Sequence, residues 1–225
     1  MPRDYSLLGE DGRQAEASGL ANPSWFRPAV DPADIRALMK KDDTRAMRDT
    51  LLWLGLMVVF AGIGIALWPS LWSIPFWLAY GVLYGSASDS RWHECGHRTA
   101  FETGWKNEVV YHLASFMLMR NPYIWRASHV RHHTDTIVVG RDPEIVAMRP
   151  PDLARLGLNV FGLIDVWVLG KRMLLHASGR LHPEEETYLR AQDRPKVFMV
   201  ARLWLLIYAV VILLSIGMGS ILPLM

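Results

Sequence analysis

Five histidines in two short blocks are the side chains of this sequence best suited to chemistry. The first block reads His93-Glu-Cys-Gly-His97 and the second reads His129-Val-Arg-His132-His133. Side chains three or four positions apart share one face of a helix, so each block would present its imidazoles as a stripe. The chain has only 8 histidines in 225 residues, and imidazole is the commonest metal-ligating side chain. The two blocks therefore predict a metal site.

Carboxylates near the blocks are candidates for holding ligand histidines in place. Asp89 lies four positions before His93, where it could accept the second ring N–H of that imidazole and fix its tautomer. Asp142 and Glu144 follow the second block in a polar loop and could act in the same way. The alternatives are an ordinary helix-end carboxylate for Asp89 and plain surface charges for the loop. The sequence leaves both readings open.

Four more residues with reactive side chains lack the spacing of a cluster. His112 lies in an apolar run between the blocks and is either a further metal ligand or a core histidine. Cys95 is expected to be a small buried hydrophobe rather than a ligand. It is the only cysteine, so an internal disulfide is excluded. His176 and His182 are expected to be surface residues.

Composition indicates a membrane protein. Hydrophobic residues make up 51% of the chain, and the mean hydropathy is +0.13. Residues 51–88 contain no Asp, Glu, Lys or Arg, and this run is long enough for two membrane spans of about 20 residues each. The net charge of +2, without a basic patch interleaved with aromatic residues, argues against a nucleic-acid partner.

The apolar runs predict three transmembrane helices. They cover about residues 50–68, 71–90 and 197–217. Four basic residues precede the first of them: Lys40, Lys41, Arg45 and Arg48. By the positive-inside rule these residues place the N-terminus in the cytoplasm. The first histidine block, which follows the second span, is then expected on the cytoplasmic side.

Shorter helices are expected at the membrane surface. Residues 107–119 are apolar but too few to span, which predicts a re-entrant or interfacial helix. Residues 125–134 should form the helix that carries the second block. From Asp152 onward, apolar residues at helical spacing predict an amphipathic helix on the membrane. Residues 1–30, rich in Gly, Pro, Ser and charge, predict a flexible tail, and residues 31–225 form one domain. The fold class is therefore all-α, an integral membrane helical bundle.

The histidine blocks and their flanks resemble the membrane fatty acid desaturase and hydroxylase superfamily, the histidine-box di-iron enzymes. The motifs are Asp89-Ser-Arg-Trp-His93-Glu-Cys-Gly-His97, Trp125-Arg-Ala-Ser-His129-Val-Arg-His132-His133-Thr-Asp and Gly140-Arg-Asp-Pro-Glu144. Their order and the expected topology match over roughly residues 50–217. The resemblance implies two iron ions on the cytoplasmic side. It assigns them His93 and His97 from the first box and His129, His132 and His133 from the second.

The resemblance also implies a reaction. Such enzymes are O2-dependent oxidoreductases that remove hydrogens from, or insert oxygen into, an unactivated C–H bond of a lipid or acyl chain. Electrons come from a ferredoxin, a rubredoxin or a cytochrome b5-type partner. The family also has a fourth span and a third box of the H-x-x-H-H type, and nothing after His182 matches either. We therefore expect this chain to be the N-terminal part of such an enzyme, truncated at its C-terminus.

Two other interpretations stay open. His93-Glu94-x-x-His97 also fits the H-E-x-x-H pattern of zinc metalloproteases, with Glu94 as the general base. That assignment leaves the second block without a role. The other interpretation is an inactive membrane fragment that serves as a scaffold. Metal content distinguishes the desaturase interpretation from the protease interpretation. A desaturase-like enzyme would hold two irons per chain, whereas a protease would hold a single zinc.

Overall fold

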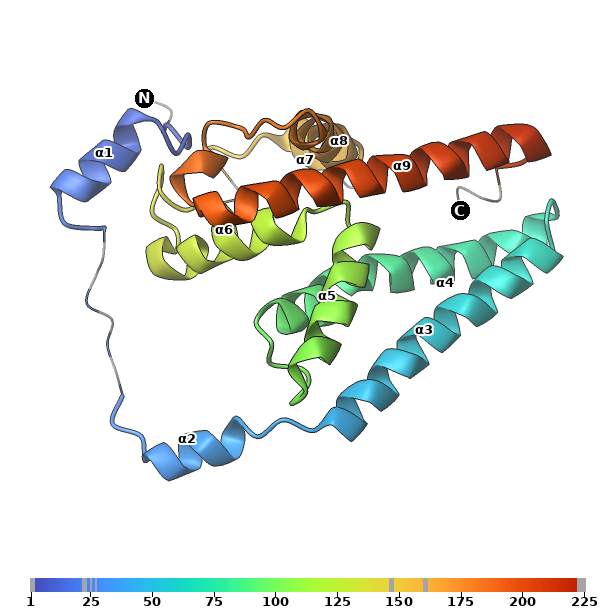
Figure 1. Ribbon diagram of the computed structural model, residues 1–225, viewed down its shortest axis with the longest axis horizontal. Coiled ribbons are helices and arrows are strands. Elements are labelled where there is room, and N and C mark those ends of the chain that lie inside the picture. Colours follow the sequence, from blue (N-terminus) through green and yellow to red (C-terminus); the bar gives the residue numbers. More distant parts are fainter. Residues whose placement is uncertain are drawn as a thin grey trace. The chain divides into compact units, whose positions relative to one another are not determined.

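The computed structural model describes residues 3–21, 24, 26, 28–145, 148–159 and 162–221, except for the side chains of residues 88–90. All secondary structure within these residues is helical (Figure 1), which confirms the predicted all-α class. The chain divides into two compact units. One comprises Met1–Arg27 with Met119–Ala209, and the other comprises Pro28–Leu118 with Val210–Met225.

The second of these units begins with two capped helices. In α2 (Pro32–Leu38) the side chain of Asp31 accepts a hydrogen bond from the backbone of Ala33. In α3 (Asp43–Ala66) the side chain of Asp42 accepts from the first backbone N–H groups. Capping aspartates satisfy donors that have no partner inside the helix, so each helix begins directly after an Asp.

An antiparallel hairpin of α3 and α4 (Ile74–Gly85) forms the core of this unit (Figure 1). The indole N–H of Trp53 donates to the carbonyl of Leu83 at 2.9 Å, which joins the two helices. Gly64 allows the Trp77 ring to approach, because a Cβ at Gly64 would lie 2.8 Å from the ring. Short α5 (Gly104–Met117) follows, as the apolar run over residues 107–119 predicts.

Two helical stretches of the described chain are long and apolar enough to cross a membrane. They are Pro32–Ala66 and Ala191–Met218. The first includes all but the last two residues of the predicted span 50–68, and the second includes the whole predicted span 197–217. Large apolar side chains on both remain exposed, for example Leu52, Val58 and Leu206. Lipid tails would cover such a surface, so the helices indicate an integral membrane protein.

The second predicted span differs from a single α-helix. Here α4 has 12 residues, or about 18 Å of rise, and is followed by a 3-10 turn over Ser86–Ser88 and a π-helix over Asp89–Glu94. Gly85 and the serines after it are weak α-helix formers, which accounts for the change of helix type. The pattern of apolar residues alone does not predict this change from α-helix to 3-10 turn and π-helix.

The other unit contains the helix of the second histidine block, α6 (Pro122–Asp135). The side chain of Asn121 caps α6 by accepting from Tyr123, and it donates to the carbonyl of Val197 in α9 (Arg194–Met218) at 3.0 Å. Contacts of this kind join α6 to the part of α9 that belongs to the unit.

Two further helices of this unit lie where the sequence predicts one amphipathic surface helix. They are α7 (Leu153–Asn159) and α8 (Leu163–Ala177). The pair meets the length and hydropathy of a span only when taken together, and it is bent by 80°. It is therefore either a broken span, which would cross the membrane a third time, or a re-entrant loop, which would not cross it.

The N-terminal residues form more structure than a tail requires. Within residues 3–21, Glu10–Ala17 form α1, and its residues Gly12 and Ala15 are buried. These residues belong to the same compact unit as α6. The flexibility expected of residues 1–30 stays a prediction, but their described part is helical and has packing partners.

Candidate metal centre

The first histidine box lies where the π-helix ends. The backbone N–H of His97 donates to the carbonyl of His93 at 3.0 Å, and the two Nε2 atoms lie 3.1 Å apart. Both side chains are exposed. The neighbouring indole of Trp92 is buried and donates to Ser115 of α5 at 3.1 Å. A buried anchor next to an exposed histidine pair fixes the direction in which the pair points.

The chain after this box is attached to the start of α3. Asp43 accepts hydrogen bonds from the backbone and hydroxyl of Thr103 and from Lys106, whose Nζ lies 2.7 Å away. The hydrogen bonds from Lys106 and Thr103 hold the pKa of Asp43 below its usual range. Lys41 also donates to the carbonyl of Arg98 at 2.7 Å, so the loop is held at two points.

In the second box, two of the three imidazole rings are hydrogen-bonded to a carboxylate. His129 Nδ1 lies 2.7 Å from Glu144, and His132 Nδ1 lies 2.9 Å from both oxygens of Asp142. A carboxylate accepts, so the shared proton belongs to Nδ1 and the lone pair to Nε2 in each neutral imidazole. That tautomer is the one in which Nε2 can bind a metal. The loop carboxylates are therefore not plain surface charges.

The remaining histidine of this box completes a pair like the first one. His133 Nε2 lies 3.1 Å from His129 Nε2, the same spacing as in the first box. Two nitrogens at right angles on one ion, each with a metal–N bond of about 2.1 Å, would lie about 3 Å apart. The spacing within each pair thus fits neighbouring ligands of a single ion.

Backbone contacts hold the loop with the two carboxylates in a tight turn. Asp142 is buried and accepts from the backbone N–H groups of Ile137 at 2.9 Å and of Glu144 at 2.8 Å. Ser128 donates its hydroxyl to Glu144 at 2.8 Å. Burial raises the pKa of Glu144, but the hydrogen bonds from His129 and Ser128, together with the nearby charges of His129 and His132, leave its pKa below the usual value.

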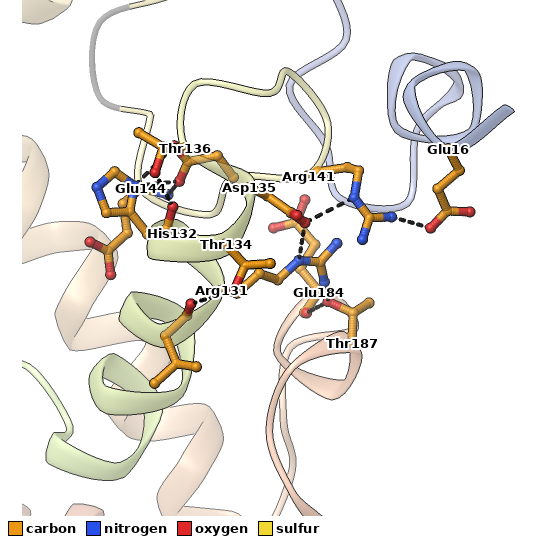
Figure 2. Close-up of polar contacts among 12 residues, drawn as sticks. Glu16, Arg131, His132, Thr134, Asp135, Thr136, Arg141, Glu144, Glu184 and Thr187 are labelled. Carbon is orange, nitrogen blue, oxygen red and sulfur yellow. Dashed lines mark hydrogen bonds and ion pairs between the residues drawn. The ribbon is translucent and has the colours of Figure 1, made fainter. Parts of the chain in front are cut away.

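A chain of polar contacts lies at the C-terminal end of α6 (Figure 2). Arg131 donates to the hydroxyl of Thr187 at 2.7 Å, and Arg141 donates from Nε to Asp135 at 2.8 Å. Arg141 also pairs with Glu16 of α1. Asp135 is only 2% exposed, so this buried carboxylate joins the helix of the second box to the loop that carries Asp142.

The other candidate residues fall in different places. His112 is half-buried on α5, with its ring 5.8 Å from that of Tyr111. Cys95 is buried as expected, and burial raises the pKa of its thiol to about 12. The side chain of Asp89 lies outside the described residues, so its predicted contact with His93 stays a prediction.

One prediction about the histidines is wrong. The sequence predicts His176 at the surface, but it is 3% exposed and its Nε2 lies 2.8 Å from Glu185, which is also buried. The turn around Gly179, whose φ is +83°, brings Glu185 back to the helix that carries His176. Helical spacing carries no signal for a partner nine residues away across a turn.

Comparisons with known proteins identify a family and several relatives of similar sequence. The sequence matches the fatty acid desaturase family over residues 66–225. A Delta(12) acyl-lipid conjugase (11E,13E-forming) of Impatiens balsamina is 27% identical over 171 residues, which cover 68% of this chain and 42% of the relative. The omega-6 fatty acid desaturase, endoplasmic reticulum isozyme 1, of Glycine max is 33% identical over 85 residues, or 36% and 22% of the two chains.

A third relative is the sn-1 acyl-lipid omega-3 desaturase (ferredoxin) of Nostoc sp. (strain 36), which is 31% identical over 67 residues, 30% of this chain and 18% of that one. The chain spans less than half the length of these relatives. No solved structure matches it. The family match covers more than half of the chain and includes both histidine boxes. The chain therefore belongs to the fatty acid desaturase family.

Proposed function

We propose that this chain carries the iron-binding part of an O2-dependent membrane oxidoreductase that acts on a lipid acyl chain. The observation that supports it most is the pairing of the second-box imidazoles with Glu144 and Asp142. Carboxylate–histidine pairs of this kind orient metal ligands in proteins. If the two loop carboxylates were ordinary surface charges, water would solvate them, and they would not both hydrogen-bond to ring nitrogens of the same helix.

The residues present fit iron. Imidazole nitrogens suit iron as well as zinc or copper, and the 3.1 Å spacing within each pair is that of ligands on one ion. We assign as ligands His93, His97, His129, His132 and His133, with His112 as a possible sixth. In this assignment Asp142 and Glu144 orient the second box, and Asp89 has the same role for His93.

Two bound irons would supply the activation of O2 and the exchange of electrons with the substrate. In a desaturation, the acyl chain loses two hydrogens, and these, with two electrons from a donor and two protons, reduce O2 to two waters. In a hydroxylation, one oxygen atom enters the C–H bond, and the other is reduced to water by two electrons from the donor and two protons. The chain's own contribution is to hold the histidines in the ligand tautomer.

Substrate and partners follow from the same assignment. Acyl-lipid substrates are named for the Impatiens and Nostoc relatives, and we propose an acyl chain in the membrane as the substrate here. The Nostoc relative is named for ferredoxin, so a ferredoxin, or a rubredoxin or cytochrome b5-type protein, is the proposed electron donor. Lys40 and Lys41 lie just before α3, and Arg45 and Arg48 lie in its first turns. This basic cluster favours a cytoplasmic position for the N-terminus and the histidine boxes.

Metal analysis of the protein purified from iron-supplied membranes tests this function. We expect two irons per chain in the wild type, and large losses of iron in His97→Ala and in His132→Ala. The matched control is His182→Ala, which removes a partly exposed histidine outside both boxes and should keep its iron. A single zinc would instead support the metalloprotease assignment. A wild-type protein without metal would leave only a scaffold role.

A further inference from the structure

The N-terminal segment, residues 3–21, contacts the loop that carries Asp142 and Glu144. The closest approach is between the backbones of Gly12 in α1 and Gly140 in the loop. A Cβ added at Gly12 would lie 2.5 Å from the carbonyl oxygen of Gly140, and one added at Gly140 would lie 2.4 Å from the backbone nitrogen of Gly12. Neither distance is compatible with a side chain, so this contact requires glycine on both sides.

Glycine at position 12 is unfavourable for α1 taken by itself. The helix has only 8 residues, a length that is not stable in water without tertiary contacts, and glycine is a poor helix former. The contact with Gly140 offsets this disadvantage. If α1 were a surface helix without a partner, replacing Gly12 by alanine would strengthen it, whereas here the same change must displace it.

Polar contacts join the same two segments. Glu16 of α1 pairs with Arg141, whose guanidinium also donates to buried Asp135 at the end of α6 (Figure 2). Arg141 is the residue between Gly140 and Asp142. Its side chain is therefore held from one direction by the N-terminal segment and from another by the helix of the second histidine box.

The start of the segment has its own attachment. Glu184 accepts a hydrogen bond from the hydroxyl of Ser6 at 3.0 Å and from the backbone N–H of Leu7 at 3.1 Å. The backbone N–H of Arg149, at the far end of the loop, donates to the hydroxyl of Tyr5 at 2.9 Å. The segment thus contacts the loop on both sides of Asp142 and Glu144.

We propose that the N-terminal segment is a positioning element for the second histidine box. By holding the loop at Gly140, Arg141 and Arg149, it keeps Asp142 against His132 and Glu144 against His129. The role of these histidines as iron ligands rests on the proposed function, but the attachment of the segment to the loop does not. Residues 3–21 lie outside the matched family region, so this role goes beyond what the family match covers.

Hydrogen–deuterium exchange tests the attachment without any metal. In Gly12→Ala, the amides of residues 136–145 should exchange on the order of tenfold faster than in the wild type, because the loop loses its contact. Gly170→Ala in α8 is the matched control, since a Cβ there meets nothing within 4 Å. It should leave the exchange of this loop unchanged. Equal exchange in both variants would overturn the proposal.

A second pair of variants, with smaller structural changes, tests the attachment even if Gly12→Ala does not fold. Glu16→Gln removes the ion pair with Arg141, and Glu10→Gln removes an exposed pair within α1. We expect faster loop exchange, about twofold to threefold, only in Glu16→Gln. If Gly12→Ala fails to fold and the two glutamine variants behave alike, the proposal is also wrong.

Cobalt binding then tests the consequence for the histidines. Apo-protein titrated with Co2+ reports its ligand field in the visible spectrum, independently of turnover. We expect weaker Co2+ binding and an altered spectrum in Gly12→Ala, with Gly170→Ala matching the wild type. Wild-type protein that binds no Co2+ would refute the proposed function and leave the exchange result to decide the attachment. Identical binding in both variants would refute the positioning role alone.

Discussion

The Nδ1 atom of His132 lies 2.9 Å from both carboxylate oxygens of Asp142. The same carboxylate accepts from the backbone N–H groups of Ile137 and Glu144, so it cannot move without breaking the turn. A buried carboxylate fixed in this way sets both the tautomer and the direction of the ring. The loop that follows the second box therefore acts on the box itself.

Replacing Asp142 by asparagine should weaken metal binding through His132. An asparagine side chain can present its N–H2 group to Nδ1, and the ring then loses the acceptor that holds its proton. We expect metal affinity to fall by about 10–100-fold, measured by competition with a chelator. Asp165→Asn, at an exposed position of α8, is the control. Equal affinity in Asp142→Asn and the wild type would contradict the orienting role.

Replacing Asp43 by asparagine should lower the thermal unfolding midpoint in a pH-dependent way. The pKa of Asp43 is lowered in the folded protein by Lys106 and Thr103. Its stabilisation is therefore fully present above the unfolded-state pKa of about 3.9 and is lost as the pH falls through the lower folded-state pKa. The difference in midpoint between wild type and Asp43→Asn should be constant from neutral pH to about pH 5 and then shrink. A difference that grows on acidification would show that another group is responsible.

Replacing Gly64 by alanine should destabilise the hairpin of α3 and α4. The new Cβ would lie 2.8 Å from the Trp77 ring, so one helix must shift, at a cost of about 1–3 kcal/mol. Gly62→Ala on the same helix meets nothing within 4 Å and should be neutral or slightly stabilising. Thermal unfolding of the two variants in detergent measures the difference. Similar midpoints would mean that the two helices are not in close contact at Gly64.

Replacing His176 by alanine should reduce stability but leave the metal content unchanged. The change removes the 2.8 Å hydrogen bond to Glu185 and leaves a buried carboxylate with fewer donors, which costs about 3 kcal/mol. His182→Ala is again the control, because its side chain is 38% exposed. Loss of iron from His176→Ala, with normal stability, would instead make His176 part of the metal site.

Local sequence pattern was sufficient to predict the histidine pairs. His93 with His97, and His129 with His133, are four positions apart, and in each pair the Nε2 atoms lie 3.1 Å apart. The positions of the two helices that are long and apolar enough to cross a membrane also follow from apolar run length. In these cases the partner lies within about one helical turn or the property is summed along one helix, so the order of residues contains the information.

Contacts that cross a turn or join distant segments were beyond the sequence. The partnership of His176 with Glu185, the docking of Gly12 on Gly140 and the change from α-helix to π-helix before His93 depend on how the backbone folds back. Asp142 and Glu144 were only partly predictable from the sequence. Their residue types suggested a role, but surface charge was an equal alternative.

The sequence by itself determined the helical class, the membrane character and which imidazoles lie together within each box, because these depend on period and hydropathy. Only the tertiary structure decided that Asp142 and Glu144 each hold one of those imidazoles, and that residues 3–21 hold the loop in turn. Hydrogen bonds across a turn require the backbone on both sides to be in place, and no local pattern encodes that.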